Sequence, residues 1–212
     1  FMHKSIWILL MSTVSVAFVH ALAPDHWMPF AVIAKAQKWP KLKLLWITTI
    51  SGIGHVAISI IISVIGILSG FSLSKLKGIE GSRAEIVLWL LIGFGIAYML
   101  WGIKKAKEYK SKEIGREELK TKTVAVWTIF AVVVLGPCES LVPLVLLGYN
   151  YGWFGVVTVS ITFSVITIIM MILQSFLAFM GIQLIRNDIA ERYAHAFAGL
   201  VIALTGVLVM VL

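Results

Sequence analysis

Six long apolar segments divide this chain and constrain its fold more than any other feature. They cover approximately residues 5–34, 44–70, 85–103, 123–148, 152–181 and 190–212, and polar clusters interrupt the first and the fourth. A helix needs about 20 mostly apolar residues to cross a bilayer. The sequence therefore predicts an all-α integral membrane protein with six transmembrane helices. The first segment is expected to be a span rather than a cleaved signal peptide, because it runs into a polar cluster instead of a cleavage site.

The composition excludes several other classes of protein. Hydrophobic residues make up 60% of the 212 positions and charged residues 13%, whereas a soluble domain carries roughly 25% charged residues. This excludes a soluble globular domain, a disordered chain and, despite the net charge of +8, a nucleic-acid-binding domain. The expected partner is the lipid bilayer. A single cysteine excludes a disulfide framework.

The basic residues predict how the chain is oriented in the membrane. Fourteen of the 18 Lys and Arg residues lie in the gaps 35–43, 104–122 and 186–192. These gaps follow spans 1, 3 and 5, so all three lie on the same side of the membrane. Positive residues favour the cytoplasmic side. We therefore expect a multi-pass protein of the cell membrane with both termini outside the cytoplasm.

A short repeat divides the chain into halves. Pro24, Asp25 and His26 in ALAPDHW correspond to Pro137, Cys138 and Glu139 in VLGPCES, at an offset of 113 residues. Each half then holds three spans, and an odd number inverts the second half relative to the first. The predicted plan is a first repeat over 1–103, a cytoplasmic basic loop over 104–122 and a second repeat over 123–212.

Ionisable residues inside a membrane are costly and usually functional. The candidates gather around the prolines that are expected to break spans 1 and 4, and imidazole, carboxylate and thiol groups together suit a transition-metal ion. The candidate metal ligands are His20, Asp25, His26, His55, Cys138 and Glu139, and the candidate helix-breaking residues are Pro24, Pro29, Pro137 and Pro143.

Charge and spacing refine this metal hypothesis. Asp25 and Glu139 would neutralise a divalent ion, so Cys138 is expected to be a neutral thiol, a transient soft ligand or a packing residue. Glycines before His55, in the sequence SGIGH, permit the close helix approach that would bring this residue to span 1. Hydroxyl side chains in span 5 are expected to line a polar pathway: Ser160, Thr162, Ser164 and Thr167.

The segment HALAPDH, residues 20–26, resembles the His-x4-Asp-His signature of the nickel/cobalt transporter family, and GIGH, residues 52–55, resembles that family's second motif. The resemblance implies metal transport, with His20, Asp25, His26 and His55 as ligands or pathway residues. The six-span plan, with Pro-Cys in span 4, is similar to that of the thiol-transporter and cytochrome-c-biogenesis membrane proteins. The chain departs from the nickel/cobalt family in its number of spans and in having GPCE in the second half.

These observations favour a membrane permease for a divalent transition-metal ion, nickel or cobalt before zinc, iron, manganese or copper, rather than an enzyme. A homo-oligomer or additional permease subunits are compatible with this plan. Two alternatives remain open. One is a membrane redox protein that transfers electrons through thiols, which predicts two facing cysteines. The other is a membrane-embedded metalloenzyme, which needs an open metal position and a general base. An anion exporter is disfavoured because the apolar segments contain no interior basic residue.

Overall fold

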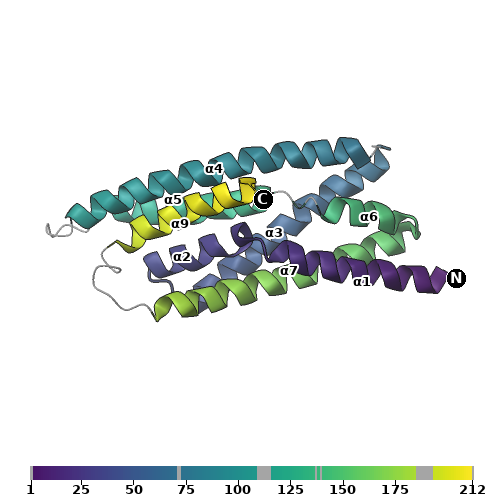
Figure 1. Ribbon diagram of the computed structural model, residues 1–212, viewed down its shortest axis with the longest axis horizontal. Coiled ribbons are helices and arrows are strands. Elements are labelled where there is room, and N and C mark those ends of the chain that lie inside the picture. Colours follow the sequence, from purple (N-terminus) through teal and green to yellow (C-terminus); the bar gives the residue numbers. More distant parts are fainter. Residues whose placement is uncertain are drawn as a thin grey trace.

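The protein is a bundle of helices, as seen in the computed structural model in Figure 1. The structure describes residues 2–70, 73–108, 116–136, 138, 140–184 and 193–211, and no strand occurs among them. The first half contains α1 (Met2–Ala21), the short 3-10 helix η1 (Pro24–His26), α2 (Met28–Ala36), α3 (Lys41–Leu68) and α4 (Leu73–Glu108). The second half contains α5 (Arg116–Leu135), α6 (Leu141–Tyr149), α7 (Gly152–Gln183) and α9 (Ala194–Val211).

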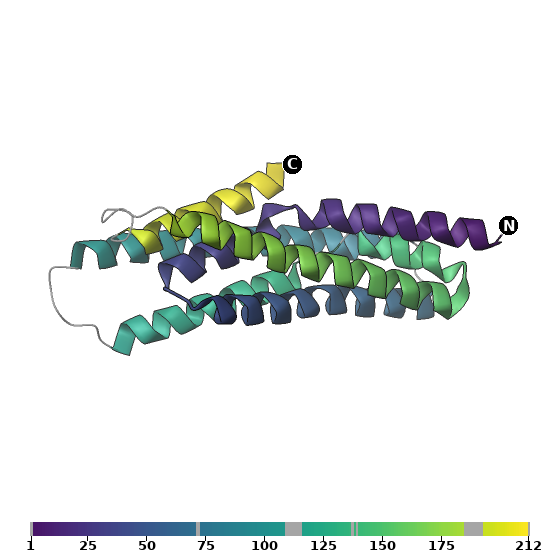
Figure 2. The same ribbon diagram turned by 90° about the horizontal axis from the view of Figure 1, so that it is seen from below.

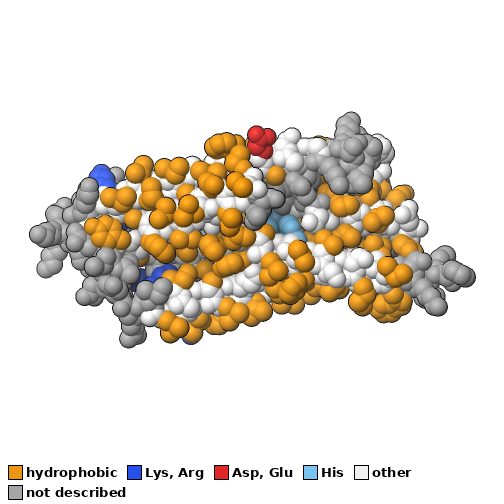
Figure 3. All heavy atoms as spheres, viewed as in Figure 1, with side chains coloured by type: hydrophobic (Ala, Val, Ile, Leu, Met, Phe, Trp, Pro, Cys, Tyr) orange, Lys and Arg blue, Asp and Glu red, His pale blue; other side chains and the backbone are white. Residues whose placement is uncertain are grey.

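The surface of the bundle is apolar, as expected for contact with lipid. Side chains such as Phe154, Ile8 and Trp127 are 72%, 67% and 65% exposed, and hydrophobic atoms cover most of the face in Figure 3. Four helical segments are long and apolar enough to cross a membrane: Lys41–Leu68, Gly81–Ala106, Gly152–Gln183 and Ala194–Val211. These features are typical of a multi-pass membrane protein.

The other two predicted spans are each divided into a long and a short helix. In the first span, α1 has 20 residues and α2 has nine. In the fourth, α5 has 20 residues and α6 has nine. The two pairs run in opposite directions along the bundle, since α1 precedes α2 from right to left in Figure 1 and α5 precedes α6 from left to right.

The prolines act differently at these interruptions. Pro24 begins η1, directly in the first break. Pro29 and Pro143 instead lie within the first turns of α2 and α6, where a missing backbone N–H costs no helical hydrogen bond. They start the second helix of each pair rather than break the first. Pro137 is outside the described residues.

The long helix α7 packs against the helices on both sides of the first break and against α3. Figure 2 shows α7 between α1 and α3, and α7 contacts both helices. On the other side, α9 packs along α4, where Gly95, Gly102 and Gly199 bring the two backbones together so closely that a Cβ atom would overlap the facing helix. Small residues are the usual means of such close packing in membranes.

Two polar segments that were expected to be loops are partly helical. Helix α4 begins at Leu73 and ends at Glu108, and α5 begins at Arg116, so both extend into gaps of the sequence plan. Leu76 gives one reason, because its buried side chain fills the space beside Gly66 of α3 and so extends the packed part of α4.

Candidate metal centre

The first helix break and the middle of α3 bring four predicted site residues together. His20 lies in the last turn of α1, and Asp25 and His26 belong to η1. His55 lies halfway along the 28-residue helix α3. Cys138 joins them from the segment between α5 and α6. The cluster therefore sits midway along the bundle, where the break after α1, the middle of α3 and the segment between α5 and α6 meet.

Three imidazole rings point the same nitrogen toward a common point. His26 Nε2 lies 3.1 Å from His20 Nε2 and 3.3 Å from His55 Nε2. The ring of His26 stands edge-on between the other two, which are nearly parallel at an interplanar angle of 13°. His26 and His55 are only 5% and 2% exposed.

The opposite ring nitrogens are held by acceptors, and this fixes the hydrogen positions. His55 Nδ1–H donates to the carbonyl oxygen of Val133 at 2.9 Å, and a carbonyl can only accept. His26 Nδ1–H donates to Asp25 Oδ1 at 3.0 Å. In the neutral rings, both Nε2 atoms then carry lone pairs that face each other. Only a proton or a metal ion between them makes this arrangement favourable.

The distances fit a metal ion. A tetrahedral ion with metal–nitrogen distances of ~2.0–2.1 Å holds neighbouring nitrogens about 3.3 Å apart, close to the observed 3.1 and 3.3 Å. Metal-binding histidines usually donate their second N–H to a carboxylate or a backbone carbonyl. Asp25 and Val133 supply one acceptor of each kind.

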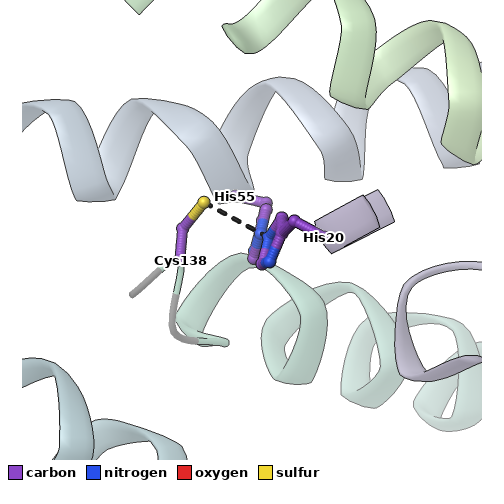
Figure 4. Close-up of side chains that lie close together, drawn as sticks. All are labelled: His20, His55 and Cys138. Atoms are coloured by element: carbon purple, nitrogen blue, oxygen red, sulfur yellow. Dashed lines mark hydrogen bonds between the residues drawn. The ribbon is translucent and has the colours of Figure 1, made fainter. Parts of the chain in front are cut away.

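Cys138 adds a sulfur atom to this group. Its Sγ lies 3.4 Å from His20 Nε2, and the ligand atoms of His20, His55 and Cys138 are all within 4.8 Å of one another. Figure 4 shows the three side chains converging from separate parts of the chain. The thiol is fully buried, so it forms one compact candidate ligand group with these two histidines.

Asp25 was predicted as a ligand, and in the structure its carboxylate lies against Nδ1 of His26. Its carboxylate accepts a hydrogen bond from Nδ1–H of His26, on the far side of the ring from the shared point. Glu139, which was predicted as a ligand, lies outside the described residues. His195 belongs to a separate group, where its Nδ1 lies 2.8 Å from the hydroxyl of Tyr98.

Three polar side chains that were not predicted from the sequence donate hydrogen bonds to backbone carbonyls at the two helix breaks. Gln174 Nε2 donates to the carbonyl of Ala21 and Ser175 Oγ to that of Trp27, so α7 satisfies carbonyls freed at the first break. At the second, Arg83 Nη2 donates to the carbonyls of Leu135 and Gly136 at 3.0 and 3.1 Å. Gln174 is the only Asn or Gln within the apolar segment 152–181. This isolated amide could have identified it as a candidate from the sequence. Arg83 had been assigned to a polar gap.

The glycines before His55 contact different helices from the one expected. Gly52 faces Ile168 and Met171 of α7, and Gly54 faces Val134 of α5. They bring α3 close to both neighbours, and His55 reaches the first break from there.

A cavity of about 310 Å³ opens beside the histidines. Its polar wall includes His20, Asp25, His26, His55 and Ser140, and apolar residues of α4 and α5 form much of the remainder. A hollow near the middle of the face in Figure 3 exposes a histidine side chain. The cluster is thus accessible from one side.

The residues of the predicted polar pathway all lie on α7, and none of them is among the residues that line the cavity beside the histidines. Ser160 and Thr167 are buried, Thr162 is half-buried, and Ser164 Oγ donates to the carbonyl of Ser160. The ring of Phe163, also on α7, lies 5.6 Å from the ring of His20.

Comparison with known proteins provides no relative: no protein-family model, curated protein or solved structure matches the chain. Its function must be argued from the site itself.

Proposed function

We propose that this chain is a membrane permease for a divalent transition-metal ion, with nickel or cobalt as the favoured cargo. One observation carries the proposal: Nε2 atoms of three buried or half-buried histidines converge, and acceptors behind two of the rings direct their lone pairs to the shared point. Imidazole is a common ligand of nickel, zinc, copper and iron ions. A cysteine sulfur beside the imidazoles would also suit softer metal ions.

The position of this cluster favours transport over a purely structural role. It lies midway along the bundle, between helices that are interrupted there, and a cavity reaches it. Irregular backbone at membrane depth is tolerated where it lines a cavity or is buried in protein. Secondary transporters place their sites at such interruptions. The carboxylate of Asp25 would offset part of the charge of a bound dication.

The proposed architecture is an inverted repeat of two three-span halves. The division of both spans into a long helix followed by a nine-residue helix supports it. So does the sequence match between residues 24–26 and 137–139. In this plan one half rocks against the other around the histidines, exposing them to each side in turn. The protein would lie in the cell membrane with its termini outside the cytoplasm, alone, as a homo-oligomer or with other subunits.

A membrane-embedded metalloenzyme is the second candidate, and the cavity favours it. A volume of about 310 Å³ exceeds what one dehydrated ion needs and admits a small organic substrate. A thiol redox protein is less favoured, because the sequence has one cysteine and cannot form a disulfide within the chain.

Metal binding by the purified protein tests the proposal. A panel of nickel, cobalt, zinc, iron, manganese and copper salts is dialysed against the native chain and against His26→Ala and His195→Gln. We expect one ion per chain for the native protein and for His195→Gln, since His195 lies in another cluster. His26→Ala should lower the affinity, because it removes the ring whose Nε2 lies within 3.1 and 3.3 Å of the other two and leaves only His20, His55 and Cys138.

Uptake of the bound metal into liposomes then separates the two candidate functions. A permease moves the ion down its gradient, and His26→Ala abolishes this flux. Metal binding without flux would favour the metalloenzyme, and absence of binding by the native chain would contradict both.

A further inference from the structure

One arginine joins the two halves of the bundle at the second helix break. Arg83 lies near the beginning of Gly81–Ala106, the part of α4 that is long and apolar enough to cross a membrane. Its Nη2 atom donates to the carbonyl oxygens of Leu135 and Gly136, at 3.0 and 3.1 Å, where α5 ends. The last carbonyls of a helix have no partner within the helix and carry partial negative charge, so a cation is favourable there.

The turn that Arg83 holds also contains the acceptor that orients a site histidine. The carbonyl oxygen of Val133 accepts a hydrogen bond from the backbone N–H of Gly136 at 3.1 Å and another from Nδ1–H of His55 at 2.9 Å. Gly136 is thus bonded on both sides, through its N–H to Val133 and through its carbonyl to Arg83. We call Arg83 and the turn over residues 133–136 the α5 clamp.

The clamp packs directly against the histidine. A Cβ atom at Gly136 would lie 3.0 Å from the carbonyl oxygen of Val133 and 3.6 Å from Nδ1 of His55. The end of α5 therefore has little room to shift without disturbing the hydrogen bond between these two residues. An arginine that only capped a helix would bond to carbonyls remote from the site, whereas here the capped turn itself supplies the acceptor for His55.

We propose that Arg83 is a positioning residue for the candidate metal centre, because it holds the end of α5 and so fixes the Val133 carbonyl that orients His55. Only the expected effect on metal binding rests on the proposed function, since the clamp consists of the chain's own groups. Arg83 and His55 come from the first half of the chain, and the turn between them comes from the second. The clamp therefore requires α4 to stay beside the end of α5 while the ion is held.

Replacement of the guanidinium tests this role, with a matched control at the other break. Arg83→Gln shortens the side chain and Arg83→Met removes its donors, and two variants are made so that the test survives if one fails to fold. Arg83→Lys keeps a cation that can donate to two carbonyls, as the single Nη2 atom does. Gln174→Leu is the control, because Gln174 donates to the carbonyl of Ala21 at the first break.

The first measurement needs no metal. Solid-state NMR of protein with isotopically labelled histidine ring nitrogens and valine carbonyl carbons detects the contact between His55 Nδ1 and Val133, and a His55→Ala sample identifies its signal. We expect this contact in the native protein, in Arg83→Lys and in Gln174→Leu, and its loss in Arg83→Gln and Arg83→Met. Thermal unfolding shows which variants remain folded. Persistence of the contact in a folded Arg83→Gln or Arg83→Met protein would overturn the inference.

Cobalt affinity then shows whether the clamp acts through the histidine. Loss of a group that supports a metal ligand typically costs ~10–100-fold in affinity, so we expect Arg83→Gln to weaken cobalt binding about tenfold and Arg83→Lys to restore it. In a His55→Ala background, Arg83→Gln should cause no further loss, because an indirect effect disappears with the residue that transmits it.

Two other outcomes have separate meanings. An equal loss of cobalt affinity with and without His55 would contradict the positioning role and leave Arg83 as a cap of α5. Failure of the native chain to bind cobalt would instead refute the proposed function, and the NMR contact would still decide whether Arg83 positions His55.

Discussion

The carboxylate of Asp25 acts on the candidate site through a histidine. It accepts a hydrogen bond from His26 Nδ1 at 3.0 Å and so turns the other nitrogen toward His20 and His55. A carbonyl oxygen of α5, from Val133, does the same for His55. These two rings are therefore already oriented in the metal-free protein, which would reduce the cost of binding an ion.

Asp25→Asn should therefore weaken metal binding without abolishing it. The amide keeps the shape of the side chain, but it loses the negative charge that holds the Nδ1–H of His26. Loss of such a supporting group typically costs ~10–100-fold in metal affinity. Titration of the purified variant with cobalt gives this value, and His195→Gln serves as the matched control. An affinity equal to that of the native chain would show that Asp25 does not orient the ring.

The sequence predicted which residues lie close together at the candidate site, but not how their side chains are oriented. His20, Asp25, His26, His55 and Cys138 were all expected near one another, because few side chains in apolar segments can ionise. The support from Gln174 and Arg83 was not predicted, since it depends on which backbone carbonyls the breaks leave free. The sequence also did not show that Asp25 would contact the Nδ1 side of the His26 ring, because this depends on the turn of η1 and not on spacing alone.

At the scale of helices, the interruptions were predictable and their geometry was not. Proline and the polar cluster marked the first break, but Pro29 and Pro143 lie inside the helices that follow the breaks. A proline in the first helical turn is favourable. A proline in the sequence can therefore mark the beginning of a helix as well as the end of one. Basic residues at 104–108 and 116–122 suggested a loop, yet α4 and α5 continue through them.

The contact between α4 and α9 depends on glycine. A Cβ atom at Gly199 would overlap the backbone of Met99 and of Gly95. Gly199→Ala should push the helices apart and lower the stability by ~1–3 kcal/mol, the usual cost of overpacking. Gly93→Ala is the matched control, because nothing lies within 4 Å of its added Cβ. Thermal unfolding in detergent should show a lower midpoint for Gly199→Ala alone, and equal midpoints would contradict the close contact.

At the scale of the whole molecule, the bundle has an apolar outer surface and a polar centre. The only cysteine lies at this centre, so a Cys138→Ala background allows single cysteines to report on each end of the bundle. Lys41 begins α3, and Asn150 follows α6 at the opposite end.

The proposed orientation predicts opposite labelling at these two positions. Asn150→Cys should react with a membrane-impermeant maleimide on intact cells. Lys41→Cys should react only after permeabilisation, because basic residues favour the cytoplasmic side. Labelling of Lys41→Cys on intact cells would contradict the orientation, and equal labelling of both from one side would contradict the proposed six-span plan.

X-ray absorption spectroscopy of the cobalt-loaded protein tests the central claim most directly, because it reports which atoms surround the metal. The account predicts a first shell dominated by nitrogen, with the outer-shell scattering of three imidazole rings, and the loss of one ring in a His55→Ala variant that still binds the ion. A shell of oxygen atoms, unchanged in His55→Ala, would show that cobalt binds elsewhere and would contradict a histidine site at the centre of the bundle.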